Sequence, residues 1–103
     1  MLIVRFKARC LSDKTDEVRE AMTAIIAPSR AMSGVINFDI GRDITDPDSF
    51  IATEVYDDRA AMDRQEAQPE VAKLLDLIGA GALAGPPEWT IYEVASAETL
   101  GVS

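Results

Sequence analysis

Apolar and polar residues alternate over the first ten positions of the chain. Every second residue from Leu2 to Cys10 is apolar, and three of the positions between them hold the basic residues Arg5, Lys7 and Arg9. A period of two is typical of a strand with one buried face and one open face. We therefore predict a first strand over residues 2–10.

The period changes to that of a helix after residue 10. Ser12 or Asp13 is placed to cap the first turn of this helix. We expect Pro28 to end or kink the helix, with a last turn running to residue 32. The buried face consists of apolar residues spaced three and four apart, namely Val18, Ala21, Met22, Ile25 and Ile26.

A hairpin follows this helix. Residues 35–42 and 49–56 predict two strands, and Gly34 fits the position just past the end of the preceding helix. The segment 43–48 between the strands is polar and contains proline, which is typical of a turn. Two strands joined by about six residues predict a hairpin.

A short helix is expected next, capped by Asp57 or Asp58 and turning Ala61, Met62 and Gln65 inward. Beyond it, a proline can open another helical segment, because its fixed backbone angle suits a first helical turn.

That proline is Pro69, and residues 71–78 after it carry a second apolar stripe of helical spacing. Glycines and prolines in the segment 79–87 then break the chain, and a fourth strand is predicted over residues 88–95.

The resulting order, β-α-β-β-α-β, predicts an α+β fold of the ferredoxin-like type with a four-stranded antiparallel sheet. Right-handed crossovers give the strand order 4-1-3-2 and place the helices on one face of the sheet. The other face is then bare, and we expect it to be rich in Ile, Phe and Val. Covering that face predicts a homodimer. We expect one domain over residues 1–95 and a tail over residues 96–103.

Composition and charge exclude several classes of function. The 103 residues include ten basic and eighteen acidic ones, a net charge of −8, which argues against nucleic acid and against anionic membrane surfaces. No apolar run reaches the ~18 residues of a membrane span. A single cysteine and no secretory signal pattern predict a cytoplasmic protein. The chain contains no histidine, so histidine-centred triads, haem sites with a proximal histidine and ordinary zinc enzymes lose their usual base or ligand.

The basic residues of the first strand have two interpretations. Arg5 and Lys7 could form cross-strand ion pairs with Glu54 or Glu93, or they could form an anion-binding site. We expect Glu54 to lie within ion-pair reach of Arg5 or Lys7. Cys10 has no neighbouring partner and is interpreted as a buried packing thiol.

Bulky and adaptable side chains also have two interpretations. They fill the core by default, or they line an apolar pocket between the helices and the sheet. They are Met22, Phe38, Tyr56, Met62, Trp89 and Tyr92.

Several segments, in order, resemble the antibiotic biosynthesis monooxygenase (ABM) domain family over roughly residues 2–95. They are Ser33-Gly34-Val35-Ile36-Asn37-Phe38-Asp39, Arg42-Asp43, Asp46-Pro47-Asp48-Ser49-Phe50-Ile51, Glu54-Val55-Tyr56, Ala60-Ala61-Met62 and Gln65-Glu66-Ala67-Gln68-Pro69. The resemblance implies a dimeric α/β barrel, and it places the chain among cofactor-independent oxygenases of aromatic polyketides and quinols, haem-degrading enzymes and members of unknown role.

Two positions depart from the family pattern. Gln65 stands where the family has a helix histidine, and Phe38 stands where it has a tyrosine. Glutamine cannot act as a general base near neutral pH, and phenylalanine cannot donate a hydrogen bond.

Two functions therefore stay open. The first is a monooxygenase without metal or cofactor that acts on a small electron-rich aromatic or quinol substrate, with Glu54 as base or orienting acceptor and Gln65 as amide donor. Phe38, Tyr56, Met62 and Met22 would then form the wall of the substrate cavity. The second is a non-catalytic dimer, ligand-binding or stress-associated, that has lost the family chemistry. A haem-degrading role ranks third, because without histidine only Tyr, Cys or Met could ligate the iron.

Overall fold

The computed structural model describes residues 1–101 and contains four strands and three helices within them. The elements in chain order are β1 (Leu2–Arg9), α1 (Thr15–Arg30), β2 (Val35–Asp43), β3 (Asp46–Tyr56), α2 (Arg59–Glu66), α3 (Pro69–Gly79) and β4 (Glu88–Glu93). None of the helices in this part of the chain is long and apolar enough to cross a membrane.

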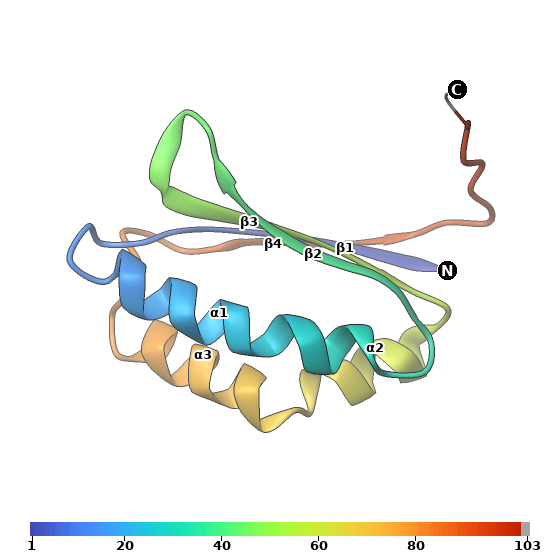
Figure 1. Cartoon of the computed structure of the whole chain (residues 1–103), viewed down its shortest axis with the longest axis horizontal. Coiled ribbons are helices and arrows are strands. Elements are labelled where there is room, and N and C mark those ends of the chain that lie inside the picture. Colours follow the sequence, from blue (N-terminus) through green and yellow to red (C-terminus); the bar gives the residue numbers. More distant parts are fainter. Residues whose placement is uncertain (102–103) are drawn as a thin grey trace.

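The strands form one antiparallel sheet in the order β2-β3-β1-β4, which confirms the predicted topology. All the helices cover the same side of the sheet (Figure 1). The tip of the β2–β3 hairpin and the segment after β4 both rise toward the opposite, uncovered side, at the two ends of the molecule (Figure 1).

Helix α1 begins with a different cap from the one predicted. Its N-cap is Lys14, without a side-chain cap, instead of Ser12 or Asp13. The helix continues through Pro28 to Arg30. At its start, the Thr15 hydroxyl donates to Asp48 Oδ1 at 2.8 Å, which ties the first turn of the helix to the hairpin. The predicted cap of the short helix is confirmed, because the Asp58 carboxylate accepts a hydrogen bond of 2.9 Å from the Ala61 backbone N–H.

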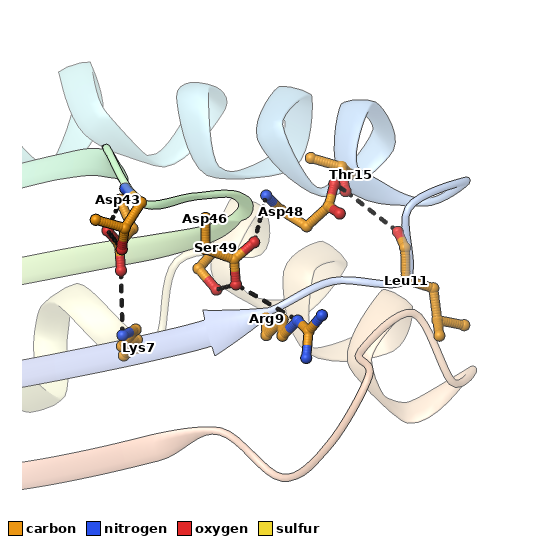
Figure 2. A network of polar contacts seen from close by, with 9 residues as sticks. Lys7, Arg9, Leu11, Thr15, Asp43, Asp46, Asp48 and Ser49 are labelled. Carbon is orange, nitrogen blue, oxygen red and sulfur yellow. Dashed lines mark hydrogen bonds and ion pairs between the residues drawn. The ribbon is translucent and has the colours of Figure 1, made fainter.

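The predicted turn over residues 43–48 is wrong, because the strands extend into it and leave only Ile44 and Thr45 between them. Asp43 accepts hydrogen bonds from the backbone N–H and the hydroxyl of Thr45, at 2.9 and 2.8 Å. Asp46 accepts from the Asp48 N–H and the Ser49 hydroxyl, at 3.1 and 2.7 Å (Figure 2). These carboxylates accept hydrogen bonds from the backbone N–H and hydroxyl groups of the hairpin end, so the polar segment forms a tight turn.

The expected ion pair between Glu54 and the basic row of β1 is wrong. Glu54 is paired in register with Val4, so it points to the helix side, whereas Arg5 and Lys7 point to the uncovered side. The prediction assumed the register in which Glu54 shares a face with Arg5, one residue away.

The basic row is instead neutralised on the uncovered face. Arg5 pairs with Glu88 at 3.7 Å, Lys7 with Asp43 at 3.3 Å and Arg9 with Asp46 at 3.4 Å. Figure 2 shows the last two pairs tying β1 to the hairpin end.

The core lies between the helices and the sheet. The stripe of Val18, Met22 and Ile25 on α1 packs against Phe38 and Phe50. Cys10 belongs to the same cluster and is 2% exposed, and its burial raises the pKa of the thiol, which confirms a buried packing role.

The uncovered face has a different composition from the one we expected. The phenylalanines of the sheet all point to the helix side, and the uncovered side carries Ile3, Ile51, Val55 and Tyr92 among Thr and charged residues. The uncovered face therefore combines a few apolar side chains with charged side chains around them.

Gly34 joins α1 to β2 in a conformation that requires glycine. Its φ is +85°, and a Cβ added there would lie 2.7 Å from the Ala61 Cβ of α2. The close approach brings the start of α2 against the start of β2, where the Asp57 N–H donates to the Gly34 carbonyl oxygen at 2.9 Å.

We predict that Gly34→Ala lowers the free energy of unfolding by about 2 kcal/mol or more, measured by urea denaturation. The matched control is Gly81→Ala, because Gly81 also has a positive φ, +93°, but no atom within 4 Å of an added Cβ. The control should cost only the backbone strain, roughly 1 kcal/mol. Equal losses for the two variants would contradict the close approach at Gly34.

Candidate active site

A small apolar cavity lies between the sheet and the helices. Its volume is about 70 Å³. Polar side chains reach it at one end, where Glu54, Gln65 and Glu66 meet. The rest of the wall is apolar: Phe6, Met22, Ile25, Phe38, Ile40, Ala52, Val71, Leu74, Leu75, Ile78 and Trp89.

Glu54 is a carboxyl group directed into the core. Strand β3 places it between Val4 of β1 and Phe38 of β2, on the helix side of the sheet. Burial raises the pKa of Glu54 from its ordinary value of 4.5 to about 7, the hydrogen bond from Tyr56 opposes this rise, and the charge of Glu66 adds to it. Glu54 therefore exchanges its proton near neutral pH, which is the range that suits a general base.

A buried chain of hydrogen bonds fixes Glu54 in place. The Tyr56 hydroxyl lies 2.5 Å from Glu54 Oε1 and 3.0 Å from Gln65 Oε1. Gln65 Nε2 donates to the Ser29 hydroxyl at 3.1 Å, and Gln68 Nε2 donates to the same oxygen at 3.0 Å. Tyr56 and Ser29 are 0% exposed and Gln65 is 3% exposed, so the middle of this hydrogen-bonded chain is closed to solvent, whereas Glu54 and Gln68 at its ends are half-buried.

The direction of the hydrogen bonds around Tyr56 depends on whether Glu54 is protonated. The Tyr56 hydroxyl has one proton and faces two acceptor oxygens, so it donates to only one of them. With Glu54 protonated, the acid donates to the phenol oxygen and the phenol donates to Gln65. With Glu54 ionised, the phenol donates to the carboxylate. Burial and the neighbouring carboxylate raise the pKa of Tyr56, so its proton stays on the phenol in both states.

Local sequence explains why these side chains meet. Gln65 lies one helical turn beyond Ala61 and Met62, on the buried stripe that the Asp58 cap sets at the start of α2. Ser29 lies four residues after Ile25 and extends the buried stripe of α1. Tyr56 follows Glu54 by two residues and so shares its face of β3.

The structure brings together four of the six residues expected at the site. Met22, Phe38, Glu54 and Gln65 line the cavity. Tyr56 lies beneath it and reaches it through Glu54 and Gln65, in a cluster with Leu2, Val4, Ala61 and Met62. Met62 borders a separate surface cleft between α2 and β4.

Sequence analysis missed Ser29, Glu66 and Gln68 as part of this site. Ser29 falls on the apolar stripe of α1 at helical spacing, and a polar residue on a buried stripe signals a buried hydrogen bond. Trp89 was named among the bulky side chains, and its ring packs edge-on against Phe6 with centroids 6.0 Å apart. Within residues 1–101, no cluster of three or more His, Cys, Asp or Glu side chains is placed to hold a metal ion.

The size of the cavity limits what it holds in this state. Sites for drug-sized ligands are usually ~300–1,000 Å³, so about 70 Å³ accommodates waters or dioxygen but no aromatic ring. Leu75 and Trp89 form the outer wall and are 49% and 52% exposed. An aromatic ring fits only when side chains of the wall move.

Comparison with known proteins places this fold and site in context. The family model described as antibiotic biosynthesis monooxygenase matches residues 1–76. The chain belongs to the antibiotic biosynthesis monooxygenase family. The match includes β1 to β3, α2 and the cavity residues Glu54 and Gln65.

Similar proteins agree with this assignment. An uncharacterised protein of Synechocystis is 30% identical over 96% of this chain and 67% of its own length. A candidate antibiotic biosynthesis monooxygenase from Nitrosomonas europaea has a TM-score of 0.83 at 25% identity, covering 93% of this chain and all (100%) of its own. A second such candidate, from Deinococcus radiodurans, has a TM-score of 0.85 at 22% identity over 99% of this chain and 100% of its own, and so shows the shared fold.

Substitutions around Glu54 should shift its pKa in opposite directions. Tyr56→Phe removes the hydrogen bond that stabilises the carboxylate, so the pKa of Glu54 should rise above about 7. Glu66→Gln removes a nearby negative charge, so the pKa of Glu54 should fall. The measurement is a titration of the Glu54 carboxyl carbon by NMR, and shifts of the same sign in both variants would contradict this arrangement.

Proposed function

We propose that this protein is a cofactor-independent monooxygenase that oxidises a small electron-rich aromatic or quinol substrate with dioxygen. The observation that carries the proposal is Glu54, a carboxyl group with a pKa of about 7 at the wall of an apolar cavity. Membership of the antibiotic biosynthesis monooxygenase family supports the reaction class.

The proposed chemistry uses electrons from the substrate alone. Glu54 removes a proton from the phenol or from the activated CH₂ group of an anthrone-like ring, which leaves an electron-rich anion. The anion transfers electrons to dioxygen and forms a C–O bond as a peroxide, which takes back the proton from Glu54. Loss of water, which takes up the remaining hydrogen of the carbon that carries the peroxide, then converts the CH₂ of the anthrone, or the attacked ring C–H of the phenol, to a carbonyl, so that one oxygen atom enters the product and the other leaves as water.

The surrounding residues would support this step without taking part in bond changes. Tyr56 and Gln65 hold the Glu54 carboxyl group in one orientation. Phe38 and Met22 supply apolar wall on either side. Low polarity favours dioxygen and a neutral substrate over water, and it strengthens the interaction of Glu54 with the proton that it removes.

One observation favours the alternative function, a non-catalytic ligand-binding dimer. Both ends of the Gln65 amide are held by Tyr56 and Ser29, so the amide that we expected to donate to the substrate is largely committed within the protein. In this alternative the cavity binds a small apolar or aromatic ligand and the hydrogen-bonded chain serves stability alone.

Oxygen uptake as a function of pH tests the proposed base. With anthrone or a hydroquinone under air, kcat/KM should rise with pH through about 7, because the carboxylate form of Glu54 accepts the proton. Glu54→Gln should lower the rate by at least ~100-fold, the usual contribution of a general base. The matched control is Glu20→Gln on the exposed face of α1, which should leave the profile unchanged.

Thermal shift measurements on the same proteins distinguish the two functions. Ligand-induced stabilisation without oxygen uptake would contradict the monooxygenase and support the binding protein. Oxygen uptake that Glu54→Gln leaves unchanged would show that Glu54 is not the base.

We further propose that the protein is a cytoplasmic homodimer that joins through the uncovered face of the sheet. Ile3, Ile51 and Val55 lie on this face, and Tyr92 beside them is 49% exposed. The hairpin tip and the segment after β4 rise at opposite ends of this face and would embrace a second copy (Figure 1). The buried Cys10, without a disulfide, fits a reducing compartment.

Sedimentation at micromolar concentration should therefore give about twice the 11.2 kDa mass of the chain. Thr53→Arg introduces a bulky charge beside Arg5 in the centre of the face and should shift the protein toward monomer. Thr23→Arg on α1, at an exposed position of the other layer, is the matched control and should stay dimeric. A wild-type monomer would contradict an interface of the ~1,000 Å² that specific association needs.

A further inference from the structure

A second, larger hollow lies at the hairpin end of the molecule. This open cleft has a volume of about 510 Å³, which falls within the range of small-ligand sites. It lies between α1 and the strands β2 and β3. Its wall is formed by Arg19, Met22, Thr23, Ile26, Ile40, Gly41, Arg42 and Phe50.

The charge of this cleft is opposite to that of the protein. Two guanidinium groups line it and no carboxylate does, although the chain has a net charge of −8. The Arg42 guanidinium lies over the Phe50 ring, 5.2 Å from the centroid, and has no ion pair or side-chain hydrogen bond within residues 1–101. Among the described residues, Arg19 makes a single long ion pair, of 4.0 Å, with Asp16, whose side chain is 92% exposed.

The cleft and the inner cavity share a wall. Met22 and Ile40 line both of them, so these two side chains lie between the cleft that contains the arginines and the space that contains Glu54. Methionine has an unbranched side chain that changes rotamer easily. A ligand that displaces Met22 would therefore occupy both spaces at once.

The strand geometry sets the length of such a ligand. Arg42 is paired with Phe50, and Glu54 lies four residues further along β3, which at about 3.4 Å per residue is about 14 Å. Side chains from both ends shorten this distance. A ligand that reaches both must have its anionic group and its ionisable hydroxyl at opposite ends of a framework longer than one ring.

We propose that Arg42, assisted by Arg19, is an anion anchor that selects hydroxylated two-ring aromatic carboxylates, with the ring between Met22 and Ile40 and the hydroxyl toward Glu54. This inference depends on the proposed function in one respect, namely that the inner cavity is the substrate site. A planar guanidinium held over a ring binds a carboxylate through two parallel hydrogen bonds and also stacks on the aromatic framework.

The test compares 6-hydroxy-2-naphthoate with the neutral 6-hydroxy-2-naphthamide, using the naphthol fluorescence of each to measure Kd. The acid should bind about fivefold or more tightly than the amide at low ionic strength, and the difference should shrink as salt increases. The one-ring acid 4-hydroxybenzoate should bind more weakly than the two-ring acid, because it cannot span from Arg42 to Glu54.

Variants locate the source of this preference. Arg42→Gln should remove the preference for the acid and leave the Kd of the amide unchanged, and Arg42→Lys should restore part of it. Arg9→Gln is the matched control, because Arg9 lies on the uncovered face next to the same hairpin. Thermal unfolding of each variant checks that the protein stays folded.

The outcomes separate this inference from the proposed function. Equal Kd values for acid and amide, or a preference that survives Arg42→Gln in a folded protein, would overturn the anchor. Arg42-dependent binding of the acid without any oxygen uptake would support the anchor and overturn the monooxygenase. Glu54-dependent oxygen uptake with neutral quinols and no preference for acids would overturn the anchor alone.

Discussion

The burial of one carboxyl group constrains the rest of this structure. An ionisable side chain inside an apolar core is costly unless hydrogen bonds satisfy it. Glu54 is hydrogen-bonded to Tyr56 on the same strand. Tyr56 is in turn held by Gln65 of α2, which is hydrogen-bonded to Ser29 of α1. The sheet therefore supplies Glu54 and Tyr56 and the helices supply Gln65 and Ser29, so the positions of α1 and α2 over the sheet are linked to the protonation state of Glu54.

Two hollows of different character share a wall between the helices and the sheet. The inner cavity is apolar, with acidic groups at one end, and the outer cleft is apolar with two cations. Met22 and Ile40 line both hollows, so groups of opposite charge lie on the two sides of one apolar wall. An arrangement of this kind orients a polar molecule before any chemistry takes place.

Much of the fold could be predicted because it depends on local spacing. The burial of Val18, Met22 and Ile25 follows from helical periodicity, and the cap at Asp58 follows from its position before α2. The face of Glu54 could not be predicted in this way. Residues 51–56 carry apolar side chains on both faces of the strand, so the pattern permits either orientation, and the choice depends on pairing with β1, which lies far away in the sequence. The bounds of the β2–β3 turn were predicted wrongly for a related reason. Asp46 and Asp48 are typical turn residues, but their carboxylates bond within the hairpin and to α1.

Strand β4 supplies part of the outer wall of the inner cavity. It pairs with β1 alone, it is six residues long, and every one of its residues is exposed. Few buried contacts mean a small free energy of local opening, so this edge of the sheet should open more readily than the central strands. Trp89 belongs to this strand and closes the cavity beside Phe6. The outer wall of the cavity is thus carried by an edge strand, which can move with less loss of buried contact than the helices on its other side.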